Sequence, residues 1–370
     1  VRGHSNVQGD RTVGINHKPS RGFLDALRNT TGINPPISHG HDSVSSVLAM
    51  LEGEASVFLS MGGNFVSAMS DTESTSKAIQ NCDLSVQIST KPNRSHLVTG
   101  KTALILPCLG RTEKDVTAIG HQFVSVENSM GIVHSSRGAA KPASKHLMSE
   151  PGIVSGIASA LDNKIGFSGI EWSNLSDNYD KIRDLIESSI PGFDSYNDRV
   201  RESSGFYLPN PPRDSRTFNT DTGKANFRVN SISSISPAPD QFVMMTIRSH
   251  DQYNTTIYGL DDRYRGIKDS RRIVMMCKQD MDSLGIRTGT MVDLTSHFEG
   301  QQLSAPKWRV VEYDIPAGNI ATYFPEANCL IPLNSVAEGS NTPTSKSVCV
   351  TVCPTSENMR FWNRSATQAA

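Results

Sequence analysis

The sequence ASVFLSMGGN at residues 55–64 is a continuous apolar run that ends in two glycines and an asparagine. A run of this kind is typical of a strand that is buried on both faces. Glycines at its end indicate either a tight turn or a backbone that a ligand approaches closely. We therefore expect a strand of a parallel sheet here, with Gly62, Gly63 and Asn64 at its carboxyl end, and both interpretations of the glycines stay open.

The segments on either side of this strand predict an α/β layer. SVSSVLAMLEG at 43–53 and SDTESTSKAIQNC at 70–82 have helical spacing, and the first ends in a glycine. DLSVQIST at 83–90 and TALILP at 102–107 indicate further strands. Alternating strands and helices with short connections predict a parallel, Rossmann-like sheet, which binds ligands beyond the carboxyl ends of its strands. Ser89, Thr90 and Lys91 follow the second strand and are candidates for such a site.

Composition limits the functional class of this chain. A length of 370 residues predicts two domains, and a net charge of −1 argues against a general nucleic-acid-binding protein. No apolar run approaches the roughly 18–20 residues that a membrane-spanning helix needs. The six cysteines lie far apart without metal-ligand spacing. We expect free thiols in a reducing, cytoplasmic compartment, with no nucleic acid or membrane span.

The second half of the chain predicts a β domain after a linker. Residues 112–150 are irregular, residues 151–190 have helical spacing, and residues 206–240 are rich in Pro, Ser, Asn and Asp. From 241 onward, short β runs alternate with polar turns, interrupted by one short helix at 278–286, which predicts a small barrel or sandwich. We therefore expect an α/β domain at 1–205, a linker at 206–240 and an all-β domain at 241–370.

Three polar loops of the β domain are candidate ligand-binding segments. TIRSHDQYNTT contains Arg248, a guanidinium that suits phosphate, and the second loop, EGSNTPTSK, is rich in hydrogen-bond donors. The third, YFPEANCL, also lies between β runs. An exposed polar turn without a ligand explains each loop about equally well. The candidate residues are Arg248, His250, Tyr253, Asn254, Tyr323, Glu326, Asn328, Asn341, Thr342 and Lys346.

The order of these segments resembles one enzyme family. VRGHSNVQGD at residues 1–10 resembles the RGxxNVQG element of molybdopterin oxidoreductases, particularly formate dehydrogenase catalytic subunits. GEASVFLSMGGNF resembles the family's pterin-nucleotide-binding α/β region, and VSVENSMGIVHSSRG resembles a further loop of it. FNTDTGKANF, IRSHDQYNT, ATYFPEAN and SNTPTSKSVCVTV resemble successive parts of its C-terminal region. The likeness covers nearly all of residues 1–355 and is nearest to the formate-dehydrogenase-like, YdeP-like group.

This resemblance implies a fold and a cofactor. The β domain would be a six-stranded double-psi barrel, and the full-length protein would bind molybdopterin guanine dinucleotide as Mo-bis-MGD. The α/β layer would share chain with an N-terminal half, so this segment would expose an unfinished sheet edge or an apolar patch. The implied cofactor-binding residues are Gly3, Ser5, Asn6, Gln8, Gly62, Gly63, Asn64, Ser89, Thr90, Lys91, Arg248, His250, Tyr253, Asn254, Tyr323, Glu326, Asn328, Asn341, Thr342 and Lys346.

The resemblance also implies the chemistry. Arg2 would stabilise a small anionic substrate, formate or a related oxyanion, and His4 would face the pterin. Formate dehydrogenases usually have Gln in place of His4, so the substrate stays open, as does the electron acceptor. The metal ligand and any iron–sulfur cysteines would lie upstream, so we expect no protein metal ligand here and little activity from this segment alone. The alternative is a non-catalytic nucleotide- or pterin-binding module.

Overall fold

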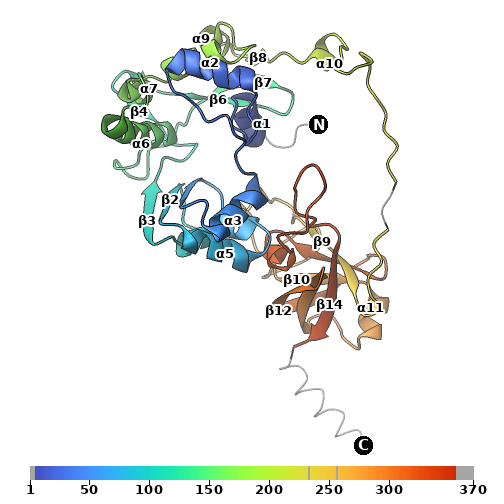
Figure 1. Ribbon diagram of the computed structural model, residues 1–370. Helices are drawn as coiled ribbons and strands as arrows, with labels where there is room; N and C mark the ends of the chain where they lie inside the picture. The colour runs from blue at the N-terminus through green and yellow to red at the C-terminus, as the bar shows by residue number, and fades with distance from the viewer. Residues whose placement is uncertain (1–4, 232–233, 256, 356–370) are drawn as a thin grey trace, which may run out of the picture. The chain divides into compact units, whose positions relative to one another are not determined.

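The computed structural model describes residues 5–231, 234–255 and 257–355 (Figure 1). The chain divides into two compact units. Unit 1 combines the chain up to Gly40 with Pro107–Ser231, and unit 2 combines His41–Leu106 with the chain from Ile232 onward. The segment that carries the parallel sheet therefore belongs to the same compact unit as the C-terminal strands. The predicted boundaries of the two domains, near residues 205 and 240, stay a prediction.

Two helices of unit 2 begin and end where local sequence signals place them. Helix α3 (Ser43–Glu52) begins after Asp42, whose carboxylate accepts hydrogen bonds from the amides of Val44 and Ser45, and it ends at Gly53 with a φ of 79°. Helix α5 (Thr72–Asn81) begins after Asp71, which accepts from the Ser74 amide. Side-chain caps and a left-handed glycine satisfy the end groups that a helix leaves unpaired. Both predicted helices are confirmed.

A three-stranded sheet lies beside these helices in the order β1–β2–β3. Strand β1 (Val57–Met61) pairs in parallel with β2 (Leu84–Ser89), with Val57 opposite Leu84 and Met61 opposite Ile88. Strand β3 (Thr102–Pro107) lies on the other side of β2. The predicted parallel sheet is confirmed. Phe58 of β1 packs against a core from both helices that includes Val47, Met50 and Ala78.

The expected burial of β1 on both faces is wrong. Val57, Leu59 and Met61, which alternate along the strand, are 57%, 49% and 45% exposed. The reason is position, since β1 is an edge strand and only its Phe58 face packs on the core beside α3 and α5. Central β2 is the strand whose interior residues are buried on both faces. An apolar patch, as expected for an unfinished sheet, is therefore present on β1.

The C-terminal part of unit 2 is a closed six-stranded barrel with the strand order β10–β12–β11–β14–β9–β13. Pairing is mixed, since β9 runs parallel to β13 and antiparallel to β14. Its core contains Met244, Val292, Leu294, Trp308 and Val350, none of which is exposed. The strands are β9 (Phe242–Ile247), β10 (Ile273–Met276), β11 (Met291–Phe298), β12 (Gln301–Glu312), β13 (Asn319–Tyr323) and β14 (Val348–Pro354). The predicted barrel is confirmed, and the predicted short helix is α11 (Lys278–Ser283).

Unit 1 contains helices and small antiparallel sheets. The predicted helical region 151–190 is confirmed as three helices, and β6 and β7 form a hairpin to which β8 adds. Its aromatic core includes Phe193 and Tyr196, whose ring centroids are 4.6 Å apart. The elements are α1 (Ser5–Thr12), α2 (Arg21–Thr31), β4 (Val116–Thr117), β5 (Gly120–His121), β6 (Val124–Glu127), β7 (Ile132–Ser136), α6 (Glu150–Ile165), α7 (Trp172–Asp177), α8 (Tyr179–Ser189), α9 (Tyr196–Arg199), β8 (Phe206–Tyr207) and α10 (Pro211–Asp214).

The remaining elements are short. Helix α4 (Phe65–Ala68) and the 3-10 turn η1 (Arg94–Leu97) follow β1 and β2, and the 3-10 turn η2 (Glu326–Leu330) follows β13. Residues 215–231 and 234–240 contain no helix or strand, in keeping with the composition of a linker. Among the described residues, no helix has both the length and the apolar character that crossing a bilayer requires.

Candidate functional site

One end of the barrel brings together three of the predicted polar loops. Because β9 and β13 are parallel, both strands end on the same side, and antiparallel β14 begins there. The segment 248–255 follows β9, η2 follows β13, and the loop 335–346 precedes β14. This end of the barrel therefore places the predicted loops beside one another, although they lie up to about a hundred residues apart in the sequence.

Two cations at this end are close to each other. The Lys346 ammonium donates to the Thr246 carbonyl, and Arg248 Nη2 lies 3.3 Å from Asn254 Oδ1. Partial burial and the nearby charge of Arg248 lower the pKa of Lys346. Within the described ranges, neither cation has a carboxylate within ion-pair distance. Two neighbouring positive charges without a paired acid favour the binding of an anion such as phosphate.

The other candidates of these loops that are not buried have different protein contacts. The His250 ring lies on Tyr264, with centroids 3.7 Å apart, and its Nε2 is 3.4 Å from Asp251 Oδ1. Asn341 donates to both carboxylate oxygens of Asp42, each at 3.0 Å, and so contacts the residue that caps the start of α3. Tyr253 and Thr342 are exposed. The roles of these residues toward a ligand stay predictions.

Three other candidates contact buried protein groups. Tyr323 is buried and donates to Asp262 Oδ2 at 2.8 Å. Glu326 accepts from the guanidinium of Arg271. Asn328 is 3% exposed and donates to the carbonyls of Ser67 and Ala68, which links η2 to α4. These side chains already have protein partners that shape the loops, and a contact with a cofactor stays a prediction for each.

The carboxyl ends of β1 and β2 form a second group. Gly62 and Gly63 have φ values of 68° and 73°, which only glycine adopts without strain, and a Cβ at either position would meet no atom within 4 Å. Buried Asn64 accepts from Ser95 Oγ at 3.0 Å, and Gly63 O accepts from Asn93. The backbone here is open to the approach of another molecule. Ser89 contacts Lys91, whose side chain is exposed, as is Thr90.

Unit 1 contains the predicted residues that begin the chain. Arg2, Gly3 and His4 lie outside the described residues, and Ser5 and Asn6 belong to α1. Buried Gln8 donates to Glu127 Oε1 at 2.6 Å and to the Asn128 carbonyl at 2.7 Å, which ties α1 to the β6–β7 hairpin.

Two polar groups were missed by sequence reasoning. Arg271 is buried between the loops at the barrel end. The buried His96 of η1 accepts from the Asn93 amide through Nδ1, and its Nε2 has no hydrogen-bond partner among the described residues. No local pattern distinguishes either residue from an exposed polar residue, because burial depends on which distant segments pack on them.

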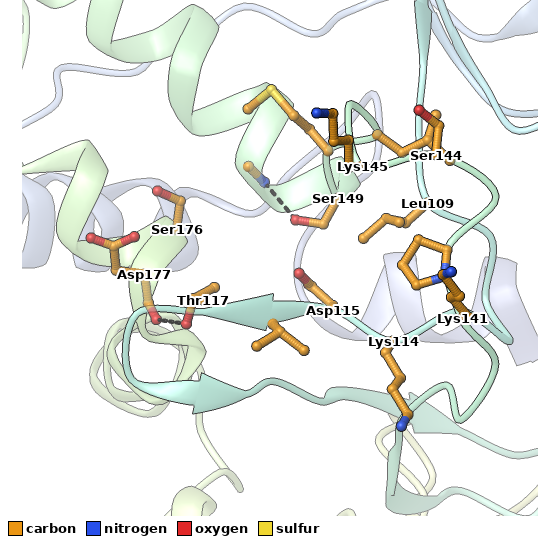
Figure 2. A pocket seen from close by; sticks show the side chains of 15 residues that line it. Leu109, Lys114, Asp115, Thr117, Lys141, Ser144, Lys145, Ser149, Ser176 and Asp177 are labelled. Atoms are coloured by element: carbon orange, nitrogen blue, oxygen red, sulfur yellow. Dashed lines mark hydrogen bonds between the residues drawn. The ribbon is translucent and has the colours of Figure 1, made fainter.

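A cavity of about 730 Å³ lies in unit 1, between β4, the segment that precedes α6 and the end of α7 (Figure 2). Its lysines, Lys114, Lys141 and Lys145, are exposed. Its buried network is satisfied internally, because Ser149 Oγ lies 2.6 Å from the Tyr179 hydroxyl, which donates to Asp115. Burial is the main cause that raises the pKa of Tyr179 well above its ordinary value, and the hydrogen bond to Asp115 raises it further. None of the sequence-predicted site residues that the structure describes lines the cavity.

Comparison with known families and proteins identifies the barrel. The Molydopterin dinucleotide binding domain family matches residues 242–354. This range begins at the first residue of β9 and ends at the last residue of β14. An uncharacterized oxidoreductase of Mycobacterium tuberculosis is 50% identical over 360 residues, covering 96% of this chain and 46% of that protein. Protein YdeP of Escherichia coli is 42% identical, covering 96% and 47%.

A solved structure shares the fold. Acetylene hydratase from Pelobacter acetylenicus matches with a TM-score of 0.57 and 12% sequence identity, covering 90% of this chain and 50% of that one. The chain spans about half the length of the curated relatives that it matches. The barrel therefore belongs to the Molydopterin dinucleotide binding domain family, and the chain as a whole is similar to part of these oxidoreductase relatives.

Proposed function

We propose that this chain supplies nucleotide-binding parts of a bis-molybdopterin-guanine-dinucleotide-dependent oxidoreductase that performs two-electron chemistry on a small substrate. The observation that carries the proposal is that the family match coincides with a closed barrel whose one end presents Arg248 and Lys346 as a neighbouring cation pair. These two groups fit the charged diphosphate of one dinucleotide, because a guanidinium and an ammonium both form charge-assisted hydrogen bonds with phosphate oxygens.

The second dinucleotide would lie at the ends of β1 and β2. Its guanosine half would approach Gly62 and Gly63, with Asn64 and Ser89 beside it. The open space around both glycines supports this assignment. When bound, the cofactor supplies a molybdenum centre for two-electron transfer, and the residues of this chain bind and orient it.

Finer features belong to the same proposal. A double-psi topology is supported by the closed six-stranded barrel with mixed parallel and antiparallel pairing. A formate-dehydrogenase-like reaction, with Arg2 holding a small oxyanion and His4 near the pterin, is supported by the resemblance of residues 1–10. An iron–sulfur cluster and the metal ligand outside this chain, and a cytoplasmic location, rest on the same resemblance.

Titration with GDP tests the barrel site directly. Arg248→Ala and Lys346→Ala each remove one charged hydrogen-bond donor, which is worth about 1.5–3 kcal/mol, or roughly a 10- to 150-fold loss of affinity. The matched control is Arg287→Ala, because Arg287 is exposed and precedes β11, whose Val292 pairs with Pro354 at the opposite end of β14. Isothermal titration calorimetry on the 370-residue chain measures all three variants. Equal affinities for Arg248→Ala and Arg287→Ala would contradict the site.

Molybdenum analysis of the full-length protein tests the redox part of the proposal. We expect molybdenum and two pterin dinucleotides per chain, with reduction of a dye by formate. Full-length protein that binds guanosine nucleotides but purifies without metal or pterin would favour the non-catalytic binding module instead.

A further inference from the structure

Arg271 joins the two loops that form the cationic barrel end. It precedes β10, is 3% exposed, and its guanidinium donates to both loops. Toward the β13 loop, Nε and Nη2 lie 2.8 and 3.2 Å from the carboxylate oxygens of Glu326, and Nη2 lies 2.7 Å from the Phe324 carbonyl. Toward the β9 loop, Nη1 lies 2.5 Å from Ser249 Oγ and Nη2 lies 3.1 Å from Gln252 Oε1. A single buried side chain therefore donates to both loops.

Two aromatic rings cover this guanidinium. Its central carbon lies 4.2 Å from the Tyr258 ring centroid and 4.8 Å from that of Tyr323. Burying an arginine is costly unless a carboxylate and further acceptors satisfy it, and Glu326 together with the two loops supplies them. Lysine is a poor replacement, because a single ammonium cannot reach acceptors that are arranged around a planar fork.

The loop that Arg271 holds has an unfavourable backbone. Asp251 and Asn254 have φ values of 60° and 48°, in the left-handed region that non-glycine residues rarely adopt. Gln252 lies between them and donates to the carbonyls of Asn254 and Phe324, each at 2.8 Å, while its Oε1 accepts from the Ser249 amide. Strained conformations of this kind persist only where surrounding contacts enforce them. Ser249 and Gln252, which make these contacts, both also accept from Arg271.

The shape of this loop decides where the proposed ligand groups stand. Arg248 is at its start and Asn254 near its end, and the two side chains are 3.3 Å apart. Arg265 additionally holds the Arg248 carbonyl at 3.2 Å. If the loop between them relaxed, the two groups would separate, and ligand binding would have to order them again at a cost in affinity.

We propose that Arg271 is a positioning residue that preorganises residues 248–255 for binding a guanosine diphosphate group. The ligand in this inference rests on the proposed function, whereas the ordering of the loop by Arg271 does not. Arg271 itself is buried beneath the loop and acts through Ser249 and Gln252.

Hydrogen exchange of the 370-residue chain, with and without GDP, tests the inference. In Arg271→Lys we expect the amides of residues 249–255 to exchange about tenfold faster or more without ligand, while β9 and β13 keep their protection. Saturating GDP should restore the protection of the loop, and the affinity for GDP should fall about tenfold or more. Arg272→Lys is the control, because its side chain faces away, donating to the Pro306 carbonyl and lying over Trp308.

A second variant covers loss of folding. Gln252 accepts from the Arg271 guanidinium and donates to the Asn254 carbonyl, and Gln252→Ala removes this link but leaves the Arg271–Glu326 ion pair. If Arg271→Lys does not fold, the exchange of residues 249–255 in Gln252→Ala tests whether the link to Arg271 orders the loop. Unchanged exchange of residues 249–255 in a folded variant that lacks the link would overturn the inference. If wild-type protein does not bind GDP, the proposed function loses its support at this site, while the exchange rates without ligand still decide whether Arg271 orders the loop.

Discussion

Replacing Asn328 with alanine separates two roles for a residue that sequence reasoning placed in the cofactor site. Its amide donates to the carbonyls of Ser67 and Ala68, at 3.0 and 2.7 Å. The main-chain carbonyls of Asn328 and Ile331 accept from the main-chain amide of Asp71, at 3.1 and 2.9 Å. The side chain therefore holds α4 against the turn after β13, while main-chain carbonyls hold the residue before α5, and alanine would keep only this main-chain contact.

The expected loss follows from two hydrogen bonds. Each contributes about 0.5–1.5 kcal/mol net, so Asn328→Ala should lower the free energy of unfolding of unit 2 by about 1–3 kcal/mol. Urea denaturation followed by pulsed hydrogen exchange reports the barrel peptides separately from unit 1. The control is Asn334→Ala, because Asn334 lies a few residues further along the same connection and is exposed.

Binding measurements complete this test. If Asn328 acts only as a structural link, GDP affinity should change less than about threefold at temperatures where the variant is folded. A variant of wild-type stability that binds GDP at least tenfold more weakly would refute this reasoning and return Asn328 to the cofactor site.

Three further predictions concern other parts of the chain. Lys346 has a lowered pKa, so its ammonium should lose its charge, and GDP affinity should fall, as pH rises through a value below the ordinary 10.5. Lys346→Arg should remove this fall in affinity. The same dependence of GDP affinity on pH in both proteins would argue against Lys346 as a ligand. Hydrogen bonds, mainly from Ser168 and also from Trp172, lower the pKa of Asp162 from the ordinary 3.8 to about 2. The contribution of Asp162 to stability is therefore present above pH 3.8 and is lost as pH falls toward 2. Asp162→Asn should flatten that loss in acid denaturation, and an unchanged profile would contradict it. Leu59→Thr should reduce self-association in light scattering without lowering the melting temperature, because Leu59 is exposed on an edge strand; increased association would count against the patch.

Local features of this protein could be predicted from its sequence. The caps of α3 and α5 involve residues within three positions of Asp42 and Asp71, so the printed sequence already contains both partners. The short β runs after residue 241, separated by polar turns, were identified as strands. In the structure burial alternates along β9 and along most of β11, because one face of each strand lines the barrel core. The polar loops at the barrel end were also identified, since donors and charges between β runs are visible locally.

Other features depend on which distant segments meet. The apolar Leu59 is exposed on the edge strand β1, whereas even the polar Ser85 and Gln87 are buried in the central strand β2, so the polarity of these side chains does not indicate their burial. Arg271 looks like any cation before a strand, yet its acceptors on Ser249 and Glu326 are 22 and 55 residues away. Sequence determines local geometry because neighbours along the chain are always in contact, but burial and charge pairing are decided only when the tertiary fold selects which remote groups share a low-dielectric site.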